Sequence, residues 1–238
     1  MFGLRALDFR TSKTMGQAER SGACQGTVAH GLASGMVAGT KVATEMGWRP
    51  VEGILPGDRV LTFDGGLQEV VSVQRGHLWS SATTCPRHMW PLRVAPGTIG
   101  NTEVAFLLPE QPVMIESDCA EALLGDPFAL IPAAALQGYA GVEPMAPPHD
   151  LNVVILHFAT EQVVFANMGA LFLCPAAQHP IDLMRILSED DMSPYVPLPL
   201  DQAALLLAVI EADTGPDNTF FTLPDTPGHA ACSAVAPP

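Results

Sequence analysis

The sequence from residue 39 to residue 62 reads GTKVATEMGWRPVEGILPGDRVLT. It contains β-prone runs at 41–44, 51–55 and 59–63, and glycine and proline separate them. Pro56-Gly57-Asp58 is a strong turn signal between the last two runs, because proline presets φ and glycine tolerates positive φ. Short runs with regular turn punctuation are typical of an all-β sandwich or barrel-like body. The stretch therefore predicts a mainly β fold.

The charge of the chain is strongly negative and unevenly distributed. Its 238 residues include 11 lysines and arginines and 25 aspartates and glutamates, a formal net charge of −14. Residues 1–93 carry a net +3, whereas residues 94–238 carry a net −17 and contain one basic residue, Arg185. A surface this acidic repels phosphate groups, so we expect neither nucleic acid nor an anionic membrane as a partner.

Short helices are expected to interrupt the strands. Asp118, with Glu121 three residues later, has the pattern of a helix N-cap, and Gly125 is placed to end that helix. Residues 132–137 predict a second short helix, with proline in its first turn and a glycine after its end. Beyond Pro175 the periodicity becomes helical over residues 182–187 and 201–212.

Two further strand pairs are predicted between residues 153 and 174. Residues 153–158 and 162–166 flank three turn-compatible residues and are expected to form a hairpin. Asn167-Met168-Gly169 is expected to turn the chain into a strand over residues 170–174.

These patterns divide the chain into three parts. Residues 1–33 are expected to form a flexible N-terminal arm, and residues 34–176 a β-rich domain. Residues 177–238 are expected to form a C-terminal extension that is helical and partly disordered. Within it, an apolar stripe is expected to pack against the β domain or a second copy of the chain; the stripe consists of Leu205, Leu206, Val209 and Ile210.

The quoted stretch resembles the opening of Hint (hedgehog/intein) domains, particularly those of Hint proteins common in marine α-proteobacteria. Those domains open with a pattern like Cys-Phe-x-x-Gly-Thr-x-Ile-x-Thr, followed by Gly-x-x-x-Val-Glu and Gly-Asp-x-Val. Two later stretches support the resemblance. LPEQPV at 108–113 lies where the family carries Ser/Thr-Pro-x-His-Arg-Val, and HFATEQVVFAN at 157–167 resembles the block His-x-x-x-x-His-Glu-Val-Val-x-Ala-Asn. The resemblance implies a Hint-like β disc over about residues 35–175.

The resemblance also implies a chemistry, in which a Cys or Ser attacks the carbonyl carbon of the preceding residue and an imidazole protonates the departing amide nitrogen. Here the nucleophile position falls on Gly35, which has no side chain. The two family histidine positions fall on Gln111 and Glu161, the Ser/Thr position falls on Leu108, and His157 is retained. We therefore expect a Hint fold without autoprocessing, which serves as a structural or interaction module with an unidentified protein partner.

One alternative stays open, because Ser34 adjoins Gly35. A shift of one residue would place a hydroxyl near the bond, and the chain would then be a self-cleaving domain that performs an N-to-O acyl shift at Ser34. Active members release a segment that precedes them, and only 34 residues precede Gly35 in this sequence. That short segment, Gly35 and Gln111 all favour the inactive alternative.

No cofactor motif is present, and the metal-site patterns are weak. Cys85-Pro86-Arg87-His88 has the spacing of half a zinc site, and Cys174 with His179 is a distant second half. Structural zinc sites normally show two tight, matched pairs, so we expect no metal. Five scattered cysteines without a secretory apolar core or a spanning segment indicate a cytoplasmic protein, with non-classical export as the other possibility.

If no metal supports the fold, chelation leaves its stability unchanged. We expect the thermal unfolding curves of the chain with and without EDTA to coincide, and elemental analysis to find substoichiometric zinc and calcium. Near-stoichiometric zinc, with a large drop in melting temperature in EDTA, would contradict this and would identify Cys85 and His88 as ligands.

Overall fold

Glycine and proline divide the described part of this chain into short strands, as the turn signals predict. The computed structural model describes residues 32–81, 83–177 and 195–214. Their elements in chain order are β1 (Met36–Val37), β2 (Lys41–Thr44), β3 (Gly47–Pro50), the 3-10 helix η1 (Val51–Gly53), β4 (Arg59–Thr62), β5 (Gly66–Glu69), β6 (Ser72–His77), η2 (Arg87–Met89), β7 (Leu92–Val94), β8 (Ala105–Leu107), β9 (Pro112–Glu116), α1 (Asp118–Leu124), β10 (Phe128–Pro132), η3 (Ala133–Leu136), η4 (Tyr139–Gly141), β11 (Glu143–Pro144), β12 (Asn152–His157), β13 (Gln162–Ala166), β14 (Ala170–Cys174) and α3 (Leu200–Thr214).

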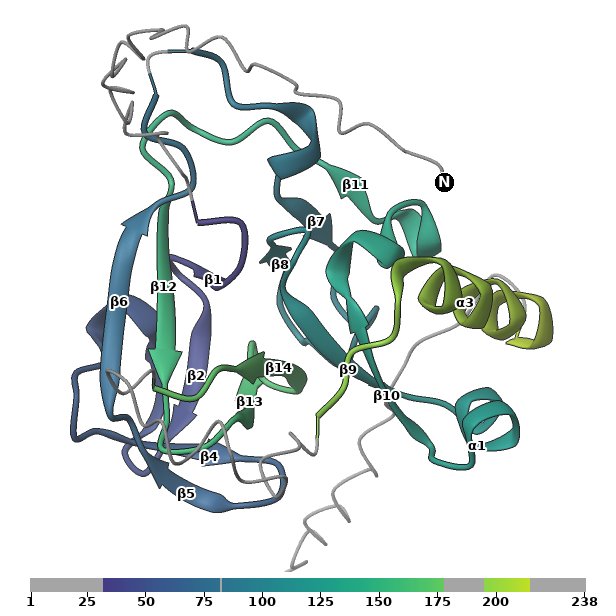
Figure 1. Ribbon diagram of the computed structural model, residues 1–238, viewed down its shortest axis with the longest axis horizontal. Helices are drawn as coiled ribbons and strands as arrows, with labels where there is room; N and C mark the ends of the chain where they lie inside the picture. Colours follow the sequence, from purple (N-terminus) through teal and green to yellow (C-terminus); the bar gives the residue numbers. More distant parts are fainter. Residues whose placement is uncertain (1–31, 82, 178–194, 215–238) are drawn as a thin grey trace, which may run out of the picture.

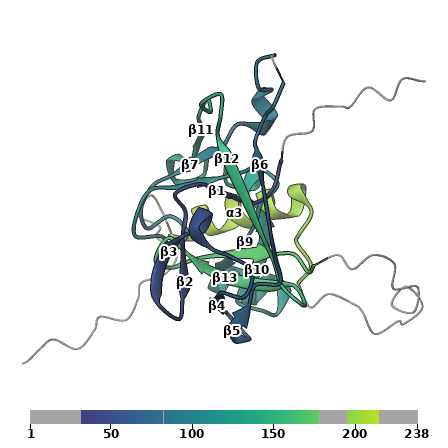
Figure 2. The same ribbon diagram turned by 90° about the vertical axis from the view of Figure 1, so that its left-hand side faces the viewer.

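The described strands form two antiparallel sheets that enclose one main core. The first sheet has the order β11-β7-β8-β1-β12-β6, and the second has the order β10-β9-β14-β13-β2-β4-β5, with β3 paired to β2. Strands β6 and β12 run side by side over their full lengths (Figures 1 and 2). Val154 and Leu156 of the first sheet share the core with Val164 and Phe172 of the second. Burial of these apolar side chains holds the two sheets together.

The β13–β14 hairpin is present as predicted, whereas the predicted hairpin over residues 153–166 is wrong. Asn167 and Met168 have positive φ (44° and 66°) in the turn between β13 and β14. In contrast, β12 belongs to the first sheet and β13 to the second. The backbone of Phe158 instead bonds to Pro175 and Ala177, so the chain leaves one sheet and enters the other between β12 and β13.

Two local predictions need correction. The run 51–55 is not a strand, because η1 forms there and the amide of Ile54 bonds to the carbonyl of Val51. Helix α1 is capped by Ser117 and not by Asp118: the extended Ser117 accepts a hydrogen bond from the Cys119 amide, and Asp118 is the first helical residue. Gly125 ends the helix in the left-handed conformation (φ 82°), as predicted.

The second short helix is also displaced. Residues 128–132 form β10, so proline at 132 ends a strand, and the helix that follows is the 3-10 helix η3, residues 133–136. Of the predicted C-terminal elements, the helix over 201–212 is confirmed as α3. The predicted helix over 182–187 and most of the predicted arm over 1–33 lie outside the described residues.

Residues 195–214 are packed tightly onto the β domain. The Tyr195 hydroxyl bonds to the Asp64 carboxylate in the β4–β5 turn, and the Leu198 amide donates to the Leu130 carbonyl on the edge strand β10 (2.8 Å). Pairing of this kind covers an edge that would otherwise be open to another chain. The side chain of Tyr195 joins an apolar cluster with Phe63 and Phe165 on the other face of the second sheet.

The predicted apolar stripe on α3 is correct for two of its four residues. Leu206 and Ile210 are buried as predicted, but their companions are Ala203 and Leu207, while Leu205 and Val209 face outward. Spacing of i, i+3, i+4 and i+7 places the four buried residues on one face of the helix. That face packs on η3, β10 and α1 and belongs to the main core (Figure 1).

In the described ranges, no helix is long and apolar enough to cross a membrane.

Because Leu206 is 4% exposed and Leu205 is 67% exposed, substitutions at these neighbours should differ sharply. We expect Leu206→Ala to lower the free energy of unfolding of the full chain by about 2–4 kcal/mol, through lost burial and a residual cavity. Leu205→Ala is the matched control and should change it by less than about 0.5 kcal/mol. Urea denaturation measures both, and equal effects would show that α3 does not dock through its buried face.

Candidate functional site

The residues leading into β1 cross the first sheet on the face opposite the main core. The amide of Leu32 bonds to the His77 carbonyl of β6 (3.2 Å), and four residues later Met36 pairs with Val154 of β12. Between these points, Ser34 is half-buried and Gly35 is buried. The Ser34–Gly35 bond therefore lies over β12. It is the bond at which the resemblance locates the family's reaction.

Gly35 occupies a backbone position that excludes other residues. Its φ is +120°, a conformation that L side chains rarely adopt. A Cβ built on it would lie 2.8 Å from Cγ1 of Ile155 and 2.9 Å from Cγ1 of Val153. A cysteine or serine at this position would require β12 to shift or the backbone to rotate.

Gln111 contacts Gly35 directly in the fold. It follows a turn, since its amide bonds to the Leu108 carbonyl (3.0 Å), and only 2% of it is exposed. The Gly35 amide donates to Oε1 of Gln111 (2.9 Å). The Nε2 group donates to the carbonyls of Pro112 (3.0 Å) and Leu173 (2.9 Å), which sets the orientation of the carboxamide.

The three polar contacts of Gln111 join separate parts of the fold. Gly35 leads into the first sheet, whereas Pro112 and Leu173 belong to β9 and β14 of the second sheet. Leu108, at the family's Ser/Thr position, is fully buried and packs in a cluster with Val37 and Val153. Position 108 therefore offers no hydroxyl to the bond and contributes packing.

His157 is the last residue of β12, and Glu161 lies in the link between β12 and β13. On β12, Val153, Ile155 and His157 alternate onto one face, the face that the Gly35 backbone crosses. His157 is two residues beyond Ile155, about 7 Å along the strand. It is half-buried, and its Nδ1 lies 3.4 Å from the Ala176 carbonyl oxygen. Glu161 is half-buried in the link between β12 and β13. Thus the structure joins Gly35 to Gln111, and the ring of His157 bonds elsewhere.

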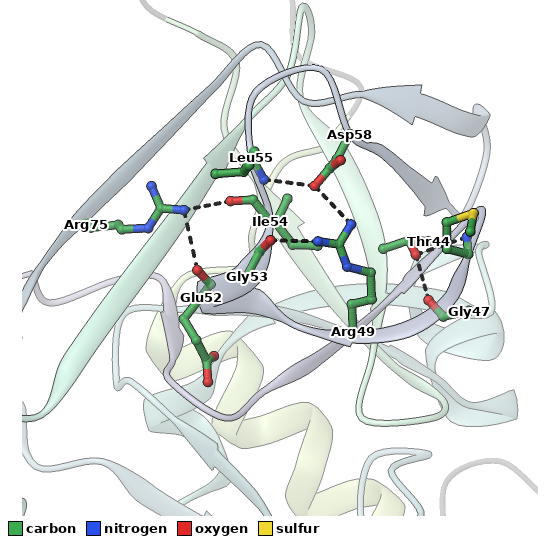
Figure 3. A network of polar contacts seen from close by, with 10 residues as sticks. Thr44, Gly47, Arg49, Glu52, Gly53, Ile54, Leu55, Asp58 and Arg75 are labelled. Carbon is green, nitrogen blue, oxygen red and sulfur yellow. Dashed lines mark hydrogen bonds and ion pairs between the residues drawn. The ribbon is translucent and has the colours of Figure 1, made fainter.

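The motif residues around the quoted stretch hold its loop in place (Figure 3). Asp58 accepts hydrogen bonds from the Leu55 amide (2.9 Å) and from Nη1 of Arg49 (3.1 Å). The other guanidinium nitrogen of Arg49 donates to the Gly53 carbonyl (2.8 Å). These acceptors all lie in the loop between β3 and β4. The Gly-Asp motif and Arg49 therefore fix the conformation of that loop.

Two anchors of this region were not expected from the sequence. Arg75 of β6 reaches the Ile54 carbonyl (2.6 Å), as Figure 3 shows, and so ties η1 to the first sheet. Asn167 exchanges two bonds with the Lys41 backbone: its Oδ1 accepts from the Lys41 amide (3.0 Å), and its own amide donates to the Lys41 carbonyl (2.8 Å). Asn167 could have been expected as an anchor, because it ends the family-like stretch at 157–167. No pattern in the neighbouring sequence predicts the contact of Arg75.

The cysteine–histidine pairs do not form a cluster in the described residues. Cys174 lies in the main core and Cys85 against the cluster of Val37 and Val153, and His179 is outside the described ranges. Burial raises the pKa of the Cys174 thiol to about 12, so it stays protonated at neutral pH. No group of three metal-ligating side chains occurs in the part of the chain that the structure describes.

A family model matches more than half of this chain. Residues 34–171 match the family model described as Hint domain. The bacterial intein-like domain from Clostridium thermocellum is similar in structure at 15% identity, over 58% of this chain and 97% of that one, with a TM-score of 0.41. The gp41-1 intein is similar at 14% identity, over 59% and 98% of the two chains, with a TM-score of 0.35. No curated protein matches the sequence.

Removal of the Gln111 carboxamide takes away a hydrogen-bond partner from the buried Gly35 amide and from the part-buried Leu173 carbonyl. We expect Gln111→Ala to lower the free energy of unfolding by about 3 kcal/mol. The exposed Gln74 of β6 supplies the control, since Gln74→Ala should cost less than about 0.5 kcal/mol. Urea denaturation measures both variants. Similarly small losses of unfolding free energy in both variants would mean that the Gln111 carboxamide does not hold residues 33–35 in place over β12.

Proposed function

Because the chain belongs to the Hint domain family, we propose that it is a Hint domain without the autoprocessing reaction, which serves as a structural or interaction module. The observation that carries this proposal is the 2.9 Å hydrogen bond from the Gly35 amide to Oε1 of Gln111. It places a neutral acceptor at the nitrogen that the family reaction must protonate.

The first requirement of the reaction is a nucleophile at position 35. Glycine supplies none, and the left-handed backbone, with Val153 and Ile155 where a Cβ would lie, leaves no room for a side chain. The surroundings of position 35 thus fit a glycine specifically. This supports a site whose packing is adapted to the absence of the nucleophile.

The second requirement is a proton donor to the departing nitrogen. An amide nitrogen leaves only when it is protonated, because its lone pair is conjugated with the carbonyl group. Gln111 faces that nitrogen with its oxygen, and both protons of its amide group are directed to the Pro112 and Leu173 carbonyls. A carboxamide in this orientation accepts the proton of the peptide N–H and has none to donate.

The alternative function is self-cleavage at Ser34, which its position beside Gly35 and its partial exposure favour. In that reaction Oγ attacks the Ala33 carbonyl carbon, the carbon–nitrogen bond to Ser34 breaks, and the hydroxyl proton passes to the released amine. An ester joins Ala33 to Ser34 Oγ as a result. Its departing nitrogen lies one residue away from the nitrogen that Gln111 contacts.

Intact-mass measurement of the full chain distinguishes the two functions. We expect the uncut mass after days of incubation, alone and with dithiothreitol or hydroxylamine, because no ester or thioester accumulates for either reagent to cleave. The matched control is Ser34→Ala. A hydroxylamine-dependent fragment that begins at Ser34, and that disappears in Ser34→Ala, would overturn the inactive assignment and establish the N-to-O acyl shift.

A further inference from the structure

Helices α1 and α3 lie side by side at the end of the molecule away from β6 (Figure 1). The Sγ atom of Cys119 on α1 lies 3.9 Å from Oδ2 of Asp213 in the last turn of α3. Ala120 of α1 shares the main core with Leu206 and Ile210 of α3. The pair therefore has one face in the core and an opposite face toward solvent.

The outward face of this pair carries large apolar side chains. Leu123 and Leu205 are 60% and 67% exposed, and Leu124 and Val209 are also exposed. Leu205 and Val209 are one turn apart on α3, and Leu123 is one turn from Cys119, where the two helices meet. We name these four residues, Leu123, Leu124, Leu205 and Val209, the leucine face. Grouped exposed apolar residues of this kind mark interaction surfaces.

Exposed acidic side chains lie on the same two helices as the leucine face. Asp118 and Glu121 lie on α1, and Glu211 and Asp213 lie near the end of α3, all with exposed or half-exposed side chains. After Arg93 the only basic residue of the sequence is Arg185, which lies outside the described residues. The electrostatic field at this end of the molecule is therefore negative, and it attracts a segment that combines apolar and basic residues.

The chain contains one such segment. Residues 1–20 read MFGLRALDFRTSKTMGQAER, with four basic residues, two acidic residues and apolar residues concentrated in the first nine positions. We propose that the leucine face binds this N-terminal segment of the same chain, with its apolar residues on the leucines and its basic residues on the acidic rim. This inference goes beyond the proposed function and is independent of whether the Ser34 bond reacts.

The length of the chain permits the contact. Leu32 is held at β6, which lies far from α3 in Figure 1, and 18 residues lie between Leu32 and Lys13. At about 3.3 Å per residue they span up to about 60 Å, whereas a domain of this size is about 40 Å across. A tether of this kind gives an effective concentration in the millimolar range, so a contact with a Kd of about 100 μM would be about 90% occupied.

Zero-length carbodiimide crosslinking tests the proposal in the full chain, because the sequence has only two lysines, Lys13 and Lys41. Lys41 is ion-paired with Glu103 at 2.7 Å, so the Lys41–Glu103 crosslink is an internal control for reaction and folding. We expect Lys13 to form crosslinks with the rim acids Asp118, Glu121, Glu211 or Asp213. Raising the salt to about 0.5 M should lower their yield several-fold.

A paired substitution tests the apolar part of the contact. The double variant Leu205→Gln, Val209→Gln should lower the Lys13 crosslinks at least threefold, with the Lys41–Glu103 crosslink unchanged. Leu55→Gln is the control, since Leu55 is exposed in the β3–β4 loop and lies outside the leucine face. It should leave both yields unchanged.

Three results would overturn the proposal. The first is absence of Lys13 crosslinks while Lys41–Glu103 forms. The second is equal crosslinking of Lys13 to acids outside the rim, such as Glu45 or Glu69. The third is formation of Lys13 crosslinks mainly between differently isotope-labelled chains, which would make a second copy the occupant. An intact mass taken before crosslinking separates each result from a failure of the proposed function.

Discussion

The hydrogen bonds of the Gln111 carboxamide hold the entry of the chain into the β domain. One oxygen and one nitrogen of a single buried side chain bond to Gly35, Pro112 and Leu173, which belong to different sheets. Buried polar groups must be paired, so each of these backbone groups depends on the same residue. The crossing of residues 33–35 over β12, the buried conformation of Gly35 and the joining of the sheets at this point follow from that arrangement.

The motif residues of the quoted stretch, together with Asn167, hold backbone groups of the loops and strand ends in place. Glu52 accepts a bond from the Gly39 amide, Asp58 holds the Leu55 amide, and Asn167 pairs with the Lys41 backbone. Each bond satisfies a backbone group in a turn or at a strand end, where no strand partner is available. Such residues are required for the fold whether or not a nucleophile and an imidazole are present. These residues lie within the range 34–171 that matches the Hint family.

The C-terminal residues 195–214 complete the β domain and add acidic side chains at one end of it. Leu198 covers an edge strand, Tyr195 packs among aromatic side chains, and α3 places four residues in the core. The opposite side of α3 is acidic and apolar together with α1. An apolar surface within a negative field favours a segment that is both apolar and basic, and the proposed docking of residues 1–20 uses this combination.

Local sequence signals determined the class of the fold and its turns. Pro56-Gly57-Asp58, Asn167 with Met168, and Gly125 act through φ and hydrogen bonds within a few residues, so the sequence by itself predicted them. The resemblance assigned Gly35 and Gln111 to one reaction, but the hydrogen bond between them, across 76 residues of sequence, is a result of the tertiary structure. Sheet assignment was decided by tertiary structure alone: residues 153–158 and 162–166 resemble a hairpin locally, but Phe158 pairs with residues that follow β14. Tertiary structure also determined which face of α3 is buried. Leu205 and Leu206 are chemically identical, and only the side on which the helix packs against the core distinguishes them.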